Sequence, residues 1–214
     1  MNKQIYLFML LIIFSCTNPE SSETSEDQAA TQTQEAKNFK VLDSYDFDLS
    51  KLSHEGEITT IKFWQDAQGD NIVLFTKQED LTKGEADLFA YHYLIEQENP
   101  RLLHDIKDSV TDCADADLLL DFDTEAFSIT DLDQDNIGEL TFAYKMTCTT
   151  DVSPQTLILH LFEGDSDYTL VGDTEVPINA EETIGGAIRE TNFADAPAMF
   201  LPHAKDVWEK VKKF

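Results

Sequence analysis

Short runs of strand-forming residues, separated by connections of only a few residues, dominate this chain and restrict its fold more than any other feature. The runs are rich in Ile, Val, Thr, Phe and Tyr, and they predict strands at 58–64, 71–76, 88–95, 126–131, 139–146, 156–162 and 168–172. The connections DAQGDN, LDQDNIGE and EGDSD have the composition of turns. Connections this short leave no room for crossover helices, so neighbouring strands are expected to pair antiparallel.

Two further elements follow from the spacing of apolar residues. At 117–123, apolar residues at alternate positions predict one more, half-exposed strand: Leu118, Leu120 and Phe122. At 204–213, a helix is predicted with lysines in its last turns, where the helix dipole favours cations, and with one apolar face: Val207, Trp208 and Val211. The predicted fold class is therefore mainly β (α+β), a single antiparallel β-rich domain with a C-terminal helix.

The charge balance excludes one class of partner. Of the 214 residues, 15 are Lys or Arg and 42 are Asp or Glu, so the formal net charge is −27. Because nucleic-acid binders neutralise phosphates with basic side chains, no nucleic-acid partner is expected. Hydrophobic residues make up 42% of the chain, which is enough for a folded core.

The N-terminus has the features of an export signal. Residues 5–14 form an apolar run that is too short to span a bilayer and typical of a signal peptide. The following Ile13-Phe14-Ser15-Cys16 resembles the lipobox of bacterial lipoproteins. This resemblance implies a signal peptide at 1–15, a diacylglycerol thioether on Cys16 and acylation of the new amine by a fatty acid such as palmitate. Several acyl chains give stable membrane anchoring.

The segment that follows Cys16 predicts a flexible tether. Residues 17–37 contain no aromatic residue and no aliphatic residue larger than Ala, so residues 16–38 are expected to be a disordered acidic linker. Its composition resembles the export tethers of surface lipoproteins in the Bacteroidetes. The expected location is the outer membrane, with the folded domain at 39–214 facing the periplasm or exposed at the surface. The membrane is then a partner through the lipid anchor.

The remaining cysteines agree with export. Once Cys16 is lipidated, only Cys113 and Cys148 are left, 35 residues apart. In an oxidising compartment such a pair is more often a disulfide than two free thiols, so a Cys113–Cys148 disulfide is predicted.

The sharpest local motif is an acidic loop between two predicted strands. Asp131, Asp133 and Asp135 stand at positions 1, 3 and 5, the backbone carbonyl of Ile137 at position 7 and Glu139 at position 9. Oxygen ligands with this spacing suit a hard cation such as calcium. An ordinary solvated hairpin in a very acidic chain is the alternative.

This loop is similar to the D-x-D-x-D-G-x-x-E hairpin of integrin-type and FG-GAP-like calcium sites. Asn136 replaces the usual Gly, and Asn tolerates a left-handed backbone better than most residues. An EF-hand would need Glu at position 12, where this chain has Phe142.

A longer resemblance includes the same loop. The run ITDLDQDNIGELTFAY at 129–144, together with Cys148, Asp151-Val-Ser-Pro154 and residues 156–164, resembles flavobacterial envelope proteins labelled as a surface polysaccharide biosynthesis family. The match covers roughly 112–172 and implies a Cys113–Cys148 pairing. It also implies a place in the envelope and supplies no catalytic residues. The expected role is binding or structural, with carbohydrate or envelope proteins as partners.

Catalytic alternatives have weaker signals. A hydrolase of envelope glycans with paired carboxylates as acid and base is the alternative function, since an acidic chain offers many such pairs. Gly164-Asp165-Ser166 resembles part of an esterase motif, but His203 lacks the Asp that the motif requires. The histidines have no zinc-ligand spacing. Three aromatic residues in predicted strands are interpreted as core rather than as a sugar-binding platform: Trp64, Tyr91 and Tyr93.

Overall fold

Residues 37–213 are described by the computed structural model, and they belong to one compact unit. The predicted signal peptide, the predicted lipidation site Cys16 and the predicted tether up to residue 36 lie outside this range. Within 37–213, no helix combines the length and the apolar composition needed to cross a membrane.

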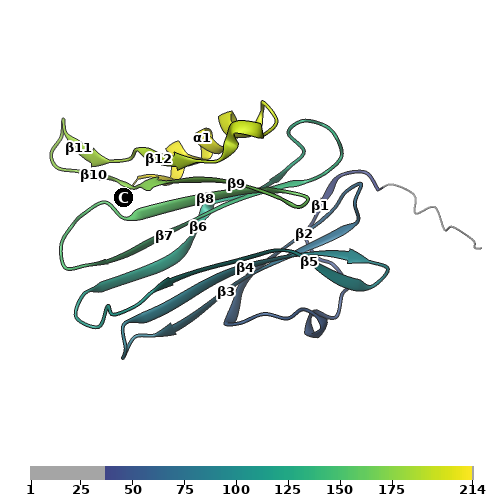
Figure 1. Ribbon diagram of the computed structural model, residues 1–214, viewed down its shortest axis with the longest axis horizontal. Coiled ribbons are helices and arrows are strands. Elements are labelled where there is room, and N and C mark those ends of the chain that lie inside the picture. Colours follow the sequence, from purple (N-terminus) through teal and green to yellow (C-terminus); the bar gives the residue numbers. More distant parts are fainter. Residues whose placement is uncertain (1–36, 214) are drawn as a thin grey trace, which may run out of the picture. The chain divides into compact units, whose positions relative to one another are not determined.

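The described chain forms two antiparallel sheets that lie face to face, as Figure 1 shows. Sheet A has the order β1-β2-β3-β4-β5, sheet B has the order β12-β9-β8-β7-β6, and β10 and β11 form a separate hairpin. The strands are β1 (Lys40–Leu42), β2 (Glu57–Gln65), β3 (Asp70–Asp80), β4 (Glu85–Glu96), β5 (Asn99–Val110), β6 (Asp117–Thr130), β7 (Glu139–Thr149), β8 (Thr156–Glu163), β9 (Ser166–Asp173), β10 (Glu175–Pro177), β11 (Thr183–Gly185) and β12 (Ile188–Thr191). The predicted antiparallel β-rich fold with a C-terminal helix is confirmed.

The alternation of side chains in the strands produces three apolar layers. The central layer lies between the sheets and is built from both, with Phe75 of β3 packing its ring against Phe122, Phe127 and Phe142 of sheet B. On the outer face of sheet B lies the helix α1 (Phe200–Val211), which buries its apolar face there. The outer face of sheet A is covered by residues 45–52, which include a short 3-10 helix, Leu49–Lys51.

The aromatic residues that the sequence analysis assigned to the core are buried, which confirms that interpretation. Trp64 is 1% exposed and lies between the sheets. Tyr91 and Tyr93 are each 5% exposed and lie in the layer on the outer face of sheet A. The three rings therefore belong to two different layers and form no common platform.

Several elements differ from the prediction, and the short strands β1, β10, β11 and β12 have no counterpart in it. Strand β5 was not predicted, because only His104 and Val110 of this edge strand are buried and its apolar residues show no strict alternation. The predicted strands at 117–123 and 126–131 are one strand, β6, with a register shift between Asp123 and Ser128, and β6 ends at Thr130. A second short 3-10 helix, Phe193–Asp195, precedes α1.

The C-terminal helix begins at Phe200, four residues before the predicted start at 204 and ends at Val211 rather than 213. Pro202 lies in the first turn of α1, where proline is tolerated because the N–H there has no intrahelical partner. Phe200 is fully buried against sheet B, so its packing extends the helix toward the N-terminus.

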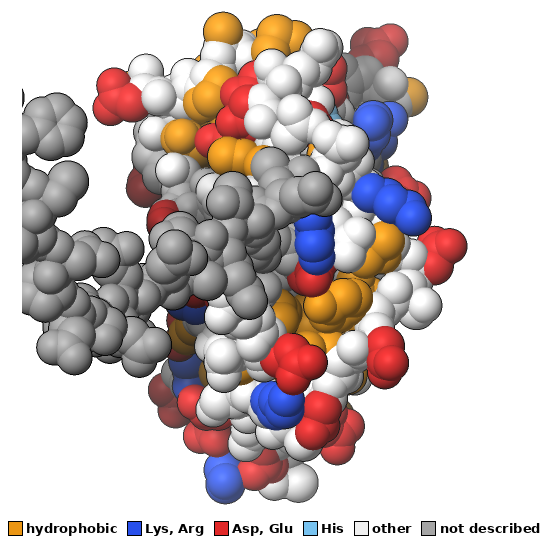
Figure 2. Space-filling model, turned by 90° about the vertical axis from the view of Figure 1, so that its right-hand side faces the viewer, with side chains coloured by type: hydrophobic (Ala, Val, Ile, Leu, Met, Phe, Trp, Pro, Cys, Tyr) orange, Lys and Arg blue, Asp and Glu red, His pale blue; other side chains and the backbone are white. Residues whose placement is uncertain are grey.

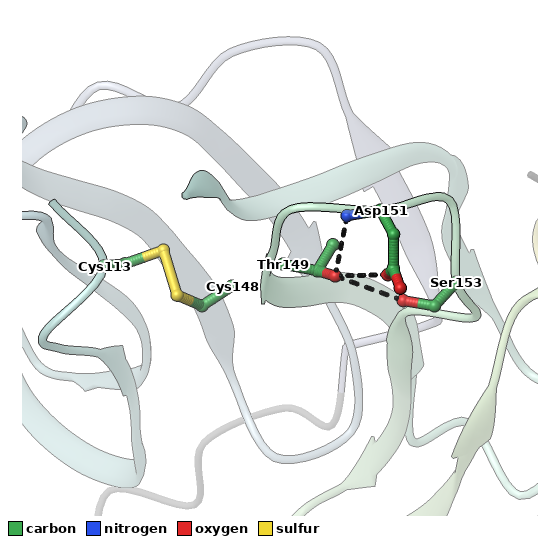
Figure 3. Close-up of a disulfide and its surroundings, with 5 residues drawn as sticks. All are labelled: Cys113, Cys148, Thr149, Asp151 and Ser153. Atoms are coloured by element: carbon green, nitrogen blue, oxygen red, sulfur yellow. Dashed lines mark hydrogen bonds between the residues drawn. A yellow bond between two sulfur atoms is a disulfide. The ribbon is translucent and has the colours of Figure 1, made fainter. Parts of the chain in front are cut away.

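The predicted disulfide is present and closes one end of the sandwich. Cys113 lies in the connection from β5 to β6, and its sulfur is bonded to that of Cys148 near the end of β7, with a Cα–Cα distance of 5.7 Å. The Cys113 N–H also donates to the Gly84 carbonyl in the turn between β3 and β4 at 3.0 Å. Figure 3 shows the disulfide and the turn after it, in which the Thr149 hydroxyl donates to Asp151 Oδ1 at 2.7 Å.

Candidate metal centre

The predicted cation loop connects β6 to β7 at the end of sheet B. β6 and β7 are adjacent antiparallel strands, and Thr130 is paired with Glu139. Residues 131–138 are therefore the loop of a β-hairpin. The carboxylates of Asp131, Asp133 and Glu139 each place an oxygen within 4.8 Å of the other two. The structure therefore brings three of the predicted ligands together.

Asp135 belongs to a second group of carboxylates. Its oxygen and those of Asp133 and Glu163 lie within 4.8 Å of one another. Asp133 belongs to both groups. We therefore treat the five residues together as the acidic cluster: Asp131, Asp133, Asp135, Glu139 and Glu163.

Glu139 is the most unusual member of the acidic cluster because it is fully buried, with an exposed fraction of 0%. Its Oε2 accepts hydrogen bonds from Thr130 Oγ1 at 3.0 Å and from the Leu132 N–H at 2.9 Å. Its Oε1 is buried and has no partner among the described residues. Burial raises the pKa of Glu139 to about 7. A buried Oδ1 of Asp131 likewise lacks a partner in the described chain.

Glu163 is a member of the acidic cluster that the sequence analysis missed. It is the last residue of β8 and lies directly opposite Glu139 in the pairing of β7 with β8. Burial, followed by the charges of Asp133 and Asp135, raises the pKa of Glu163 to about 7. The only sequence signal was its position at the start of the turn EGDSD, which does not reveal which residue of β7 it faces.

Two residues of the loop, Gln134 and Asn136, have positive backbone φ angles, which is typical of the left-handed conformation. Asn136 has φ 67°, which agrees with the expectation that Asn stands there in place of Gly. Gln134 has φ 66°, which the sequence analysis did not anticipate. Asp135 Oδ1 accepts a hydrogen bond from the Ile137 N–H at 2.7 Å, which stabilises the turn. Whether the Ile137 carbonyl is a ligand stays a prediction.

A buried carboxylate of sheet A holds the second half of the loop. Asp66, in the turn between β2 and β3, is 2% exposed. Its Oδ2 accepts hydrogen bonds from Trp64 Nε1 at 2.8 Å, Asn71 Nδ2 at 2.9 Å and the Gly138 N–H at 3.2 Å. Its Oδ1 accepts from the N–H groups of Gln68 and Gly69 at 2.9 and 3.1 Å. The Asp66 carboxylate thus accepts hydrogen bonds from five N–H groups.

The loop also touches sheet A through its backbone. The Ala67 N–H donates to the Asn136 carbonyl at 2.8 Å. A Cβ atom on Gly138 would lie 2.6 Å from Trp64 Nε1, so only glycine fits at this point. These contacts, together with those of Asp66, form a connection between the two sheets that we call the Asp66 clasp.

No histidine within residues 37–213 belongs to a group of possible metal ligands, and His92 and His203 instead contact neighbouring polar side chains. Nε2 of the buried His92 lies 2.9 Å from Asn71 Oδ1, and burial lowers the pKa of His92 well below its usual value, so its imidazole is neutral. His203 Nε2 lies 3.2 Å from Thr141 Oγ1 and 3.5 Å from Ser128 Oγ. Ser166 instead begins β9, so the structure offers no support for the esterase motif.

Charge alone does not distinguish the acidic cluster from the rest of the surface. Figure 2 shows Asp and Glu side chains scattered over the visible part of one face, with fewer Lys and Arg among them. What distinguishes the cluster is the burial of its unpartnered oxygens. No family model, curated protein or solved structure matches the chain.

Proposed function

We propose that the protein is a lipid-anchored component of the cell envelope with a binding or structural role, and that its β6–β7 loop holds a calcium ion. The observation that supports the calcium site is the fully buried Glu139, which has an unpartnered Oε1 and a carboxylate oxygen within 4.8 Å of oxygens from Asp131 and Asp133. Each of these groups is an oxygen donor, which is the ligand type that hard divalent cations prefer.

The energetic argument concerns the cost of burying a carboxylate without a partner. Transfer of an ionised carboxylate away from water is strongly unfavourable unless an opposite charge or hydrogen bonds compensate it. Oε2 of Glu139 has two hydrogen-bond donors, whereas Oε1 has none in the described chain. A bound cation would supply the missing interaction and would neutralise the neighbouring aspartates at the same time.

The envelope part of the proposal rests on the N-terminal sequence. Lipidation of Cys16 would attach the chain to the membrane, and the acidic segment up to residue 38 would separate the sandwich from the lipid surface. The resemblance of residues 112–172 to surface polysaccharide proteins supports a role connected with surface carbohydrate or with other envelope proteins. In this role the calcium ion is structural, because it joins the loop to the sheet.

A glycan hydrolase fits the same carboxylates less well. A catalytic acid or nucleophile has to contact the glycosidic bond, but Glu139 is fully buried. A surface pocket of about 550 Å³ lies elsewhere, and its lining contains no member of the acidic cluster: Gly56, Glu57, Thr59, Lys77, Gln78 and Glu79. These observations favour a metal-binding role.

Calcium is expected to stabilise the purified protein after treatment with EDTA. At a calcium concentration one hundred times Kd, binding to the folded state alone contributes about 2.7 kcal/mol. For a chain of this size that corresponds to a rise in Tm of roughly 5 to 10 °C. The measurement is isothermal titration calorimetry, with a thermal melt in parallel.

The decisive variant is Glu139→Gln, because its effect should change sign with calcium. Without calcium it should be at least as stable as the wild type, since the amide oxygen can still accept from Thr130 and Leu132 while the buried charge is removed. With calcium it should lose the rise in Tm. The control is Glu125→Gln, which removes an exposed carboxylate from the same hairpin. A rise in Tm that persists in Glu139→Gln would contradict the proposed site.

The anchor is tested separately in a bacterial host with an outer membrane. Full-length wild type should enter the detergent-rich phase of a Triton X-114 extraction, whereas Cys16→Ser should move to the aqueous phase, because it cannot receive the acyl chains. Thr17→Ser changes the neighbouring residue and should behave as the wild type. Equal partitioning of Cys16→Ser and the wild type would refute lipid anchoring at this residue.

A further inference from the structure

Two glutamates of sheet B face each other across neighbouring strands. Glu139 begins β7, Glu163 ends β8, and the two residues are direct partners in the register. Like charges directly opposite each other in a sheet are destabilising. Such a pairing is less unfavourable when one of the two carboxyl groups is protonated or when a positive charge lies nearby.

Both glutamates present an unpartnered oxygen on the same face of sheet B. Their neighbours Leu140 and Phe162 are also paired with each other and point into the layer between the sheets, so alternation directs the glutamates to the opposite face. Oε1 of Glu139 and Oε1 of Glu163 are both buried and without a hydrogen-bond partner in the described chain. Glu139 is the fully buried side chain of the pair.

No basic side chain compensates these charges within residues 37–213. The ion pairs of this region involve none of the five carboxylates of the acidic cluster. Arg101 pairs at 3.3 Å with Asp165, which is two residues beyond Glu163 in the chain. Asp133 lies within 4.8 Å of oxygens from both glutamate-containing groups and so connects them.

We propose that Glu163 is a direct ligand of the cation, so that the site is built from the β6–β7 loop and the end of β8 together, and that this extra ligand makes the site select calcium over magnesium. The inference rests on the proposed function, since it assumes that the loop binds a cation. Magnesium requires a small octahedral shell and usually keeps several waters with one or two carboxylates. Calcium accepts six to eight oxygens in a flexible arrangement, which suits carboxylates supplied by a loop and a strand.

The test compares three variants of the purified protein by calorimetric titration with calcium and with magnesium. Glu163→Gln should weaken calcium binding by about tenfold or more, and it should lower the preference for calcium over magnesium, because affinity follows the number and charge of the ligands. Asp133→Asn should weaken binding at least as much. The matched control is Asp165→Asn. Asp165 lies two residues after Glu163, carries the same charge and has a side chain that is 78% exposed.

The outcomes separate this inference from the proposed function. Unchanged calcium affinity in Glu163→Gln, with a loss in Asp133→Asn, overturns the role of Glu163 and leaves the loop site intact. Equal losses in Glu163→Gln and Asp165→Asn also overturn it, because the effect is then general electrostatics. No binding by the wild type overturns both. Thermal melts in EDTA confirm that Glu163→Gln is folded, and removal of a charge beside three aspartates should leave it at least as stable as the wild type.

Discussion

Replacement of Asp66 by alanine is expected to lower the free energy of unfolding by about 3 to 5 kcal/mol, because unsatisfied buried donors cost about 1 to 3 kcal/mol each. Asp66 accepts from the buried side chains of Trp64 and Asn71 and from the Gly138 N–H of the opposite sheet. Alanine leaves Trp64 Nε1 and the Gly138 N–H without this acceptor, whereas Asn71 Nδ2 keeps only its longer contact of 3.4 Å with the Gly69 carbonyl. Urea unfolding followed by tryptophan fluorescence measures the loss, since Trp64 itself donates to Asp66.

Two further variants define what the Asp66 clasp does. Asp46→Ala removes an exposed aspartate of the same sheet's covering segment and should change stability by less than about 0.5 kcal/mol. Asp66→Asn keeps one acceptor oxygen and should fall between the wild type and Asp66→Ala. A loss below about 1 kcal/mol in Asp66→Ala would mean that water replaces the carboxylate, and that the clasp contributes little to joining the sheets.

Removal of the Cys113–Cys148 disulfide is expected to have the second large effect. The bond closes a loop of 35 residues, for which the chain-entropy model gives about 3 to 4 kcal/mol. Cys113→Ala combined with Cys148→Ala should therefore unfold at a lower urea concentration with a similar cooperative transition. The bond joins the β5–β6 connection to β7, so its loss frees the point where the chain passes from sheet A to sheet B.

The reducing agent dithiothreitol supplies the control for this prediction. It should destabilise the wild type by a similar amount and should leave the double variant unchanged, because the variant has no disulfide to reduce. A double variant as stable as the oxidised wild type would show that packing of the connection, rather than the covalent link, holds this end of the sandwich.

The disulfide and the Asp66 clasp act at opposite ends of the same strand. Glu139 begins β7 beside the clasp, and Cys148 lies near its other end, roughly 30 Å away for an extended strand. The disulfide lies where the chain passes from sheet A to sheet B, and the Asp66 clasp lies where the β6–β7 loop of sheet B contacts the β2–β3 turn of sheet A. The acidic loop is thus held on one side by sheet A, which leaves its carboxylates gathered on the other side, against sheet B.

Much of the fold could be read from neighbouring residues. Strand runs and turn composition are local properties, so β2, β3, β4, β7, β8 and β9 were predicted within a few residues. Edge strand β5 was missed because an edge needs little apolar surface, and its pattern is irregular. The start of α1 was missed because burial of Phe200 against sheet B, and not local propensity, sets it.

In the candidate site, too, some features could be predicted from the sequence and others could not. The hairpin at 131–139, the close spacing of its aspartates and the pairing of Cys113 with Cys148 are predictable from the amino-acid sequence, because each depends on residues near in the chain or on counting cysteines. That Glu163 faces Glu139, and that Asp66 accepts from Gly138, is visible only in the folded chain. Strand register and sheet packing bring these distant residues together, and neither is encoded in any single stretch of sequence.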